Sequence, residues 1–359
     1  MNKVCFVPAE GKTNRYVELM RRAVTAAGYC LSESNSFSDV LHSDVVHFNW
    51  YEGIPQGKWA AVSTYAKKMA VLRILKLSGK RIVFTFHNKV QHEKAGGGLS
   101  KRIMKWLIRN SDGIVLHCEA SRQALLEIVP DVDTQKAVFV PHPNYIGIYP
   151  DTKPYHGFEK QDGQLVFLFM GQVRPYKNVE SVIEAANRLT DYPDIQFLIC
   201  GRCSSEEYKQ ELLAKAASPN LHFDLRFIED GEIPSLMRLA DCVLLPYNTR
   251  SALNSGAAYL AFSYGKTVVS TEIGTITDMQ QRGLVYGYHF SDCLEEDAEN
   301  LKNAVLAVYG DHRTDPDAIE RKGQTLYRIM EQENSEEAIA GKLRQIYQRQ
   351  DSARRVMRA

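Results

Sequence analysis

Short apolar runs alternate with longer amphipathic segments along the whole chain. In the first half, the runs that predict strands cover residues 3–9, 44–50, 81–88, 113–118 and 137–143. The segments between them place apolar residues at helical spacing and predict helices over residues 13–28, 58–77, 99–110 and 121–129. Because strands and helices alternate, the pattern predicts a parallel α/β sheet.

The same alternation returns in the second half. Apolar runs predict strands over residues 165–171, 195–201, 221–228, 241–247 and 266–271. Helical spacing predicts helices over residues 177–189, 205–217, 233–240, 257–264 and, in a highly charged final segment, 317–349. The runs VFLFM and CVLLP are apolar at every position, which is typical of strands that are covered on both faces.

A polar stretch without periodicity separates the two halves. Residues 149–164 contain Pro, Gly and charged residues, and we interpret residues 151–164 as a linker. A chain of 359 residues is too long for one ordinary core and suits two domains. We therefore predict two Rossmann-like, doubly wound domains facing across a cleft, over residues 1–150 and 165–330, with a final helical segment over residues 331–359.

Composition narrows the class of protein. The chain is 44% hydrophobic and 24% charged, which is ordinary for a globular protein. Its seven cysteines are scattered and mostly lie in apolar runs, which indicates reduced thiols in a cytosolic protein. The N-terminus MNKVCFVPAEG does not resemble a signal peptide, and no segment reaches the roughly 18 to 20 apolar residues of a membrane span. We therefore expect a cytoplasmic protein.

The stretch LVFLFMGQVRPYKNVE, residues 165–180, carries the first candidate chemistry. Gly171, Arg174 and Lys177 follow a buried strand and precede a helix. In an open parallel sheet, ligands bind beyond the carboxyl ends of the strands, and a helix N-terminus there attracts an anion. A guanidinium and an ammonium group added to that location suit a diphosphate. The competing interpretation is a pair of solvated loop charges.

A second stretch, residues 244–271, has the same organisation. After a buried strand, a polar loop leads to Ser255, Gly256 and Ala257, small residues at a helix start that expose N–H groups to an anion. An ordinary turn between strand and helix is the alternative. We also place Gly201 and Ile228, which end two further strand-like runs, in the same nucleotide site.

With these motifs the chain resembles the GT-B glycosyltransferases, most closely the family 4-type group that uses nucleotide sugars. The resemblance lies in G-x-x-R-x-x-K at residues 171–177, in the strand ending LLPY at Tyr247, and in A-x-x-x-G-K-x-V-V at residues 261–269. It implies that Arg174 and Lys177 neutralise the leaving diphosphate without a metal or other cofactor. It also implies that the final helices cross back to the first domain.

The chain departs from that family at one motif. Many family 4-type enzymes carry E-x7-E before the last of these motifs, and the two positions fall on about Ala252 and Leu260. Asn254 and Ser255 could supply weaker polar contacts to the donor. The departure leaves the donor sugar, the ribose contact and the stereochemistry open, with retention slightly favoured over inversion.

The first half supplies candidates for the acceptor side. His87 follows the run RIVFTF, and the resemblance places a histidine at this position beside the sugar, where it could bond a hydroxyl or act as a base. Further acceptor or base candidates are Glu10, Asn49, Trp50, His92 and Glu93. A strand end with structurally satisfied polar groups is the alternative for the histidines, and a core position is the alternative for Trp50.

The positive charge is concentrated in one region. Thirteen cations and a single acid, Glu93, lie between Lys58 and Arg109, although the net charge is only +1. On the predicted helix 99–110, cations alternate with apolar residues, as in helices that lie on an anionic membrane. An ordinary solvated face is the alternative, and no nucleic-acid-binding motif accompanies the patch. Peripheral binding to the inner face of a membrane is therefore one expectation.

Together these features predict a hexosyltransferase that moves sugar from a UDP- or GDP-linked donor to a glycan or lipid-linked acceptor, in surface polysaccharide synthesis. Two alternatives remain: a nucleotide-binding α/β protein without transfer activity, and a two-domain nucleotide-sugar epimerase. The sequence does not identify the base, the sugar or the acceptor.

Overall fold

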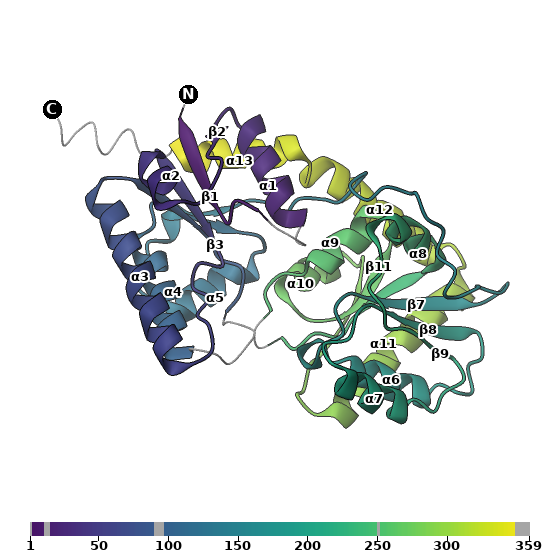
Figure 1. The fold of residues 1–359 in the computed structure, drawn as a ribbon. Coiled ribbons are helices and arrows are strands. Elements are labelled where there is room, and N and C mark those ends of the chain that lie inside the picture. Colours follow the sequence, from purple (N-terminus) through teal and green to yellow (C-terminus); the bar gives the residue numbers. More distant parts are fainter. Residues whose placement is uncertain (1, 11–14, 90–96, 250–251, 349–359) are drawn as a thin grey trace. The chain divides into compact units, whose positions relative to one another are not determined.

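The computed structural model describes residues 2–10, 15–89, 97–249 and 252–348, which form two compact units. The first unit holds the described residues up to Pro143, residues 252–254 and residues 333–348. The second unit holds Asn144–Thr249 and Ser255–Gln332. Each unit is built on a six-stranded parallel sheet flanked by helices, which confirms the predicted pair of doubly wound α/β domains (Figure 1).

The first sheet has the strand order β2-β1-β3-β4-β5-β6. Its strands are β1 (Lys3–Val7), β2 (Cys30–Leu31), β3 (Val45–Asn49), β4 (Arg81–Thr85), β5 (Gly113–Leu116) and β6 (Ala137–Phe139). The helices of this unit are α1 (Arg15–Ala26), α2 (Phe37–His42), α3 (Lys58–Leu77), α4 (Gly97–Asn110), α5 (Ala120–Ile128), a 3-10 turn η1 (Thr134–Lys136) and α13 (Glu336–Gln348).

Both faces of the first sheet are covered, because alternate strand residues enter different cores. In β4, Ile82 and Phe84 pack with Leu72 of α3, whereas Val83 between them packs with Leu343 of α13. The helix α13 lies beside α1, although more than three hundred residues separate them (Figure 1). Helix α13 thus completes one layer of the first unit.

The second sheet has the strand order β12-β11-β10-β7-β8-β9. Its strands are β7 (Leu165–Met170), β8 (Ile195–Cys200), β9 (Leu221–Asp224), β10 (Cys242–Leu245), β11 (Thr267–Thr271) and β12 (Tyr286–Tyr288). The helical elements are η2 (Pro175–Lys177), α6 (Val179–Asn187), α7 (Glu206–Lys215), η3 (Asp230–Glu232), α8 (Ile233–Leu239), α9 (Gly256–Ser263), α10 (Gly274–Gln281), α11 (Leu294–Thr314) and α12 (Ala318–Glu333).

The segment interpreted as a linker is attached to the second unit. Asp151 pairs with Arg238 of α8, and Lys160 pairs with Asp241 just before β10. Residues 151–164 therefore run along the second unit as an extended segment held by side-chain contacts.

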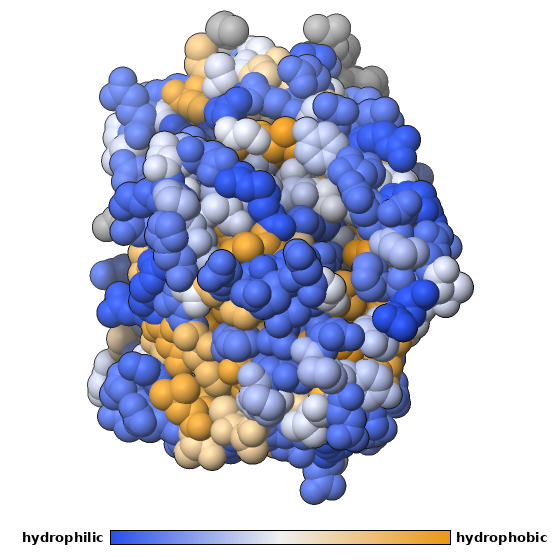
Figure 2. Space-filling model, turned by 90° about the vertical axis from the view of Figure 1, so that its right-hand side faces the viewer, coloured by the Kyte–Doolittle hydropathy of each residue, from blue (hydrophilic) through white to orange (hydrophobic). Residues whose placement is uncertain are grey.

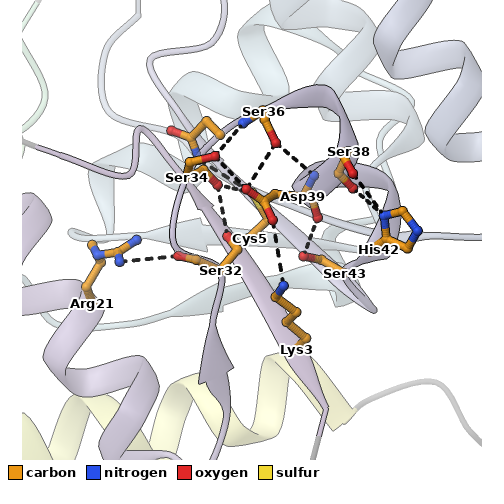
Figure 3. Close-up of polar contacts among 11 residues, drawn as sticks. Lys3, Cys5, Arg21, Ser32, Ser34, Ser36, Ser38, Asp39, His42 and Ser43 are labelled. Atoms are coloured by element: carbon orange, nitrogen blue, oxygen red, sulfur yellow. Dashed lines mark hydrogen bonds and ion pairs between the residues drawn. The ribbon is translucent and has the colours of Figure 1, made fainter.

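The short helix α2, which the apolar pattern does not predict, starts at a group of serines. Ser36 caps the helix by accepting a hydrogen bond from the Asp39 amide at 3.1 Å, and its own hydroxyl donates to the Asp39 carboxylate at 3.0 Å (Figure 3). The Ser34 hydroxyl also donates to Asp39 and is the main cause of its lowered pKa. Local polar bonds, not an apolar stripe, define this helix.

The surface is mainly polar on the face drawn in Figure 2, where hydrophobic residues gather toward the lower part. Across the described parts of the chain, no helix has the length and apolar character needed to cross a membrane. All seven cysteines are free thiols, and four of them are buried.

Candidate functional site

The strands of each sheet are parallel, so their carboxyl ends lie along one edge of the sheet. Nearly all of the predicted site residues follow strands at these edges. Ligands of open α/β sheets bind at this location. Most of the donor candidates belong to the second unit.

Two glycines adjoin at the ends of β7 and β8. Gly171 has φ +149° and Gly201 has φ +132°, values that side chains rarely adopt. A Cβ on Gly201 would collide with the carbonyl oxygen of Gly171. Both backbones continue the sheet ladder, since the Gly171 amide donates to Cys200 at 3.0 Å and the Gly201 amide donates to Asp224 at 2.9 Å. At the ends of β7 and β8, the sheet edge therefore presents two adjacent backbones without side chains.

Arg174 precedes one turn of 3-10 helix, η2, and Lys177 is the last residue of that turn. The Lys177 amide donates to the Arg174 carbonyl at 2.8 Å across η2. Arg174 itself is extended, and this bond holds its backbone close to that of Lys177. Asn178, at φ 52°, then redirects the chain into α6. Both cations are partly exposed.

Lys177 connects the first candidate stretch to the second. Its ammonium group lies 3.8 Å from the centre of the Tyr247 ring, within cation–π distance. Tyr247 follows β10, the neighbour of β7, and its hydroxyl receives a hydrogen bond from Ser255 at 3.3 Å. Ser255 also caps α9 by accepting from the Ala258 amide at 3.2 Å. The structure thus brings Lys177 close to the N-terminus of α9, where Gly256 is exposed and Ala257 partly exposed.

The remaining donor candidates, Ile228 and Asn254, are not part of the group around Lys177 and Ser255. Ile228 is buried beyond β9. Asn254 belongs to the first unit, where its amide donates to the His87 carbonyl at 3.5 Å. At the two positions that depart from the E-x7-E motif, Ala252 forms a bridge with Asn88 and Leu260 is buried in α9.

In the first unit, His87 lies two residues beyond β4 and is buried. Its Nε2 atom is 3.1 Å from Oδ1 of Asn49, the last residue of β3. Trp50 stacks on the His87 ring with the centres 4.0 Å apart and an angle of 14° between the planes. Trp50 has φ 50°, which is rare for a residue with a side chain. The structure therefore brings three of the predicted residues together.

Three members of this cluster are not among the predicted site residues. His117 and His142 lie beyond β5 and β6, and Tyr16 of α1 contacts both rings. The Tyr16 hydroxyl is 2.8 Å from Nε2 of His117. Each histidine follows or ends an apolar run, so their strand-end positions are a signal that the sequence does contain.

Burial keeps these histidines neutral. It is the main cause that lowers the pKa of His117 to about 4 and the pKa of His142 to about 3. The pKa of His87 is lowered well below its ordinary value by burial and then by His117, His142 and His47. A neutral imidazole offers one donor and one acceptor, which suits bonding or deprotonation of a hydroxyl.

The other acceptor candidates are Glu10, His92 and Glu93. Glu10 is exposed three residues beyond β1. His92 and Glu93 lie outside the described residues. Among the residues that the structure does describe, no group of three His, Cys, Asp or Glu side chains could hold a metal ion.

Part of the chain is similar to a known protein family. Residues 156–325 match the family model described as "Glycosyl transferases group 1". Among curated proteins, the D-rhamnosyltransferase WbpZ of Pseudomonas aeruginosa is 30% identical over 128 residues, which cover 36% of this chain and 32% of the relative. The GDP-mannose:glycolipid 4-beta-D-mannosyltransferase of Xanthomonas campestris pv. campestris is 24% identical over 253 residues, which cover 68% of this chain and 67% of the relative. The chain thus spans about a third of the first relative and about two thirds of the second.

Solved structures share the whole fold. Sucrose-phosphate synthase from Thermosynechococcus elongatus superposes with a TM-score of 0.70 at 14% identity, over 98% of this chain and all of the other. Anabaena Alr3699/HepE, solved in complex with UDP and glucose, has a TM-score of 0.67 at 15% identity over 96% of this chain and 98% of the other. At these identities the likeness establishes the fold, which is the fold of GT-B glycosyltransferases.

Proposed function

We propose that this protein, a GT-B member of the glycosyl transferases group 1 family through residues 156–325, transfers a hexose from a nucleoside diphosphate sugar to a glycan or lipid-linked acceptor. One observation carries the proposal. Arg174 and Lys177 lie at the two ends of a 3-10 turn that follows β7, and Lys177 lies beside the Tyr247–Ser255 pair at the start of α9. Cations, a helix N-terminus and a bare glycine edge together suit a diphosphate.

The chemistry follows from where charge develops. As the bond between sugar and diphosphate breaks, negative charge grows on the leaving phosphate. Fixed cations stabilise that charge more in the transition state than in the ground state, which lowers the barrier. In this mechanism Arg174 and Lys177 do the work that a divalent metal does in other transferases, and His87 bonds or deprotonates a sugar hydroxyl.

The relatives guide the choice of substrates. One relative is named as a GDP-mannose transferase that acts on a glycolipid, and one solved structure was determined with UDP and glucose. We therefore propose a GDP- or UDP-linked hexose as donor and a role in polysaccharide or glycolipid synthesis. Retention of configuration remains our expectation, and the anomeric coupling of the product in a proton NMR spectrum tests it.

One observation favours a second candidate function. Ala252 and Leu260 stand where many family 4-type enzymes have glutamates, and neither carries a carboxylate. A nucleotide-binding protein without transfer activity would tolerate this loss. It would bind a nucleotide diphosphate tightly and turn over no donor, whereas an epimerase would interconvert sugars without any acceptor.

A thermal-shift panel with UDP, GDP, ADP, dTDP and their sugars tests the main proposal. A ligand that binds the folded state stabilises it by about 2.7 kcal/mol at 100 times its dissociation constant, so one base should raise the melting temperature clearly. Slow hydrolysis of the matching nucleotide sugar then separates a transferase from a binding protein. A flat response across the whole panel would contradict nucleotide-sugar chemistry at this site.

We further propose that the first unit meets an anionic membrane through α3. The apolar residues of α4 that suggested an interfacial helix, among them Ile103, Met104 and Leu107, are buried in the core and cannot enter a bilayer. In α3, by contrast, Trp59 is 84% exposed and Leu77 is 88% exposed. They are eighteen residues apart, about five turns, and so project from the same side of the helix.

Cations accompany this apolar stripe. The exposed side of α3 also carries Val62, Ile74, Lys67 and Arg73. Aromatic and aliphatic side chains with interspersed cations are typical of helices that lie on anionic leaflets. This arrangement would bring the protein to a lipid-linked acceptor on the cytoplasmic face of a membrane.

Flotation with lipid vesicles tests the α3 surface. We expect binding to vesicles that contain phosphatidylglycerol, weaker binding to phosphatidylcholine vesicles, and loss of binding in a Trp59→Ser, Leu77→Ser variant. Phe227→Ser in the second unit is the matched control, because Phe227 is 61% exposed but lies outside the cationic region. Equal binding of the control and the α3 variant would remove α3 as the contact.

A further inference from the structure

The side-chain amide of Asn49 has a defined orientation. Its nitrogen Nδ2 is 3.2 Å from the backbone carbonyl oxygen of Val7. A carbonyl oxygen only accepts hydrogen bonds, so the NH2 group must face Val7, and Oδ1 must face the other way. The neighbouring strand β1 therefore determines which end of this amide is presented to His87.

The orientation of Asn49 fixes the proton on His87. Oδ1 of Asn49 lies 3.1 Å from Nε2 of His87 and carries no hydrogen, so Nε2 must be the donor. The buried ring is neutral and holds a single N–H. The other ring nitrogen, Nδ1, is then left with the lone pair.

Tyr16 does not compete for this arrangement. The Nδ1 atom of His117 is 2.7 Å from the Val140 carbonyl and must donate to it, so Nε2 of His117 is an acceptor. The Tyr16 hydroxyl, at 2.8 Å, therefore gives its one proton to His117. Its 3.5 Å distance to Oδ1 of Asn49 is the longer contact, and this oxygen remains available to His87.

We propose that Asn49 is a positioning residue that holds His87 in the Nε2–H tautomer, so that Nδ1 accepts a hydrogen bond or a proton from a hydroxyl group of the substrate. Trp50, stacked on the ring, holds its plane. The identity of the hydroxyl rests on the proposed transferase function, whereas the tautomer does not.

The other groups around His87 leave this assignment unchanged. The titratable groups that face it are His47 from β3, His117 and His142 beyond β5 and β6, and Tyr16 from α1. The three histidines are buried, and burial lowers the pKa of each, so they stay neutral near pH 7. The His87 tautomer is therefore set by hydrogen bonds and not by a neighbouring charge.

NMR of the full chain labelled with ¹⁵N-histidine tests the tautomer directly, because ring-nitrogen shifts separate protonated from unprotonated nitrogens. His87→Gln identifies the His87 signals. We expect protonated Nε2 and bare Nδ1 in the wild type, and a mixture of tautomers in Asn49→Leu. Asn35→Leu is the matched control, since Asn35 also donates to a backbone carbonyl of β1, that of Phe6 at 3.0 Å, and its other side-chain bonds go to Cys5 and Ala9. A wild-type His87 with its proton on Nδ1, or an unchanged tautomer in Asn49→Leu, would overturn the proposal.

Activity measurements identify the hydroxyl. Loss of one hydrogen bond predicts a fall in turnover of about tenfold in Asn49→Leu. A fall in both donor hydrolysis and sugar transfer assigns the hydroxyl to the donor, and a fall in transfer alone assigns it to the acceptor. Unchanged activity with a changed tautomer would refute the positioning role. If no nucleotide sugar is turned over by the wild type, the transferase proposal fails while the NMR result still stands on its own.

Discussion

Each sheet carries a candidate site at the edge where its strands end, but different kinds of groups form the two sites. In the first unit, the cluster around His87 is buried and neutral. Side chains of β3 and α1 hold it by bonds to His87 and His117, which lie just beyond β4 and β5. In the second unit, Arg174 and Lys177 are charged and partly exposed, and backbone geometry at glycines and a 3-10 turn places them. The same fold thus supports one site by side-chain packing and another by loop conformation.

The contrast follows from what each site would bind. A diphosphate carries its own charge and needs cations and N–H groups, which a loop and a helix N-terminus provide. A sugar hydroxyl is neutral, and distinguishing one hydroxyl from another needs a donor or acceptor in a fixed orientation. Changes in the second unit should therefore alter binding and chemistry through charge, whereas changes in the first should alter proton placement and stability.

The largest expected effect is on chemistry in the second unit. Lys177→Ala removes a cation that we propose stabilises the leaving diphosphate, and we expect its loss to cost about 10²- to 10³-fold in turnover. Steady-state kinetics with the nucleotide sugar selected by the thermal-shift panel measures the loss. Lys209→Ala is the control, because Lys209 lies on α7 beside Glu206 and away from η2, and it should leave turnover unchanged. Equal kinetics for the two variants would mean that Lys177 is only a surface charge.

The next effect is on the stability of the first unit at low pH. Burial lowers the pKa of His117 to about 4, below the 6.5 of an exposed histidine, so the unfolded chain binds more protons as pH falls. Stability should be full above about pH 6.5 and should fall as the pH drops toward 4. At pH 5 this one group costs about 2 kcal/mol of unfolding free energy.

Tryptophan fluorescence makes this measurement specific, because all three tryptophans, at positions 50, 59 and 106, belong to the first unit. Urea unfolding followed this way from pH 8 to pH 5 should show a shallower loss of stability in His117→Gln than in the wild type. His42→Gln serves as the control, since His42 is exposed. An identical pH dependence in the His117 variant and the wild type would show that His117 is protonated in the folded state.

Local patterns explain how much of the fold the sequence predicts. The predicted helix 58–77 has the same bounds as α3, and the apolar runs 165–171 and 195–201 contain β7 and β8. The apolar pattern does not predict helix α11, whose first turn is acidic, although its buried residues Leu301, Val305 and Val308 keep helical spacing. The short strand β2 and the serine-capped helix α2 have no periodic signal at all.

The same distinction applies to the sites. Gly171, Arg174 and Lys177 lie within seven consecutive residues, so one motif in the sequence predicts them as a candidate site. Tyr16, His117 and His142 are brought to His87 by the order of strands in the sheet, and only the structure shows their contacts. A site made by tertiary contacts leaves no spacing in the sequence.

The smallest expected effect on turnover concerns the glycines at the ends of β7 and β8 in the second unit. Gly201→Ala would place a Cβ 1.8 Å from the Gly171 carbonyl oxygen, so the backbone would have to shift, and the unfavourable φ alone costs about 1 to 3 kcal/mol of unfolding free energy. Far-UV circular dichroism should then show earlier unfolding of the second unit, while the tryptophan transition of the first unit stays in place. Gly341→Ala in α13 is the control, because a Cβ there meets nothing within 4 Å and alanine favours a helix. If Gly201→Ala unfolds like the wild type but still binds nucleotide diphosphate weakly, the close approach of the two backbones serves the ligand and not the fold.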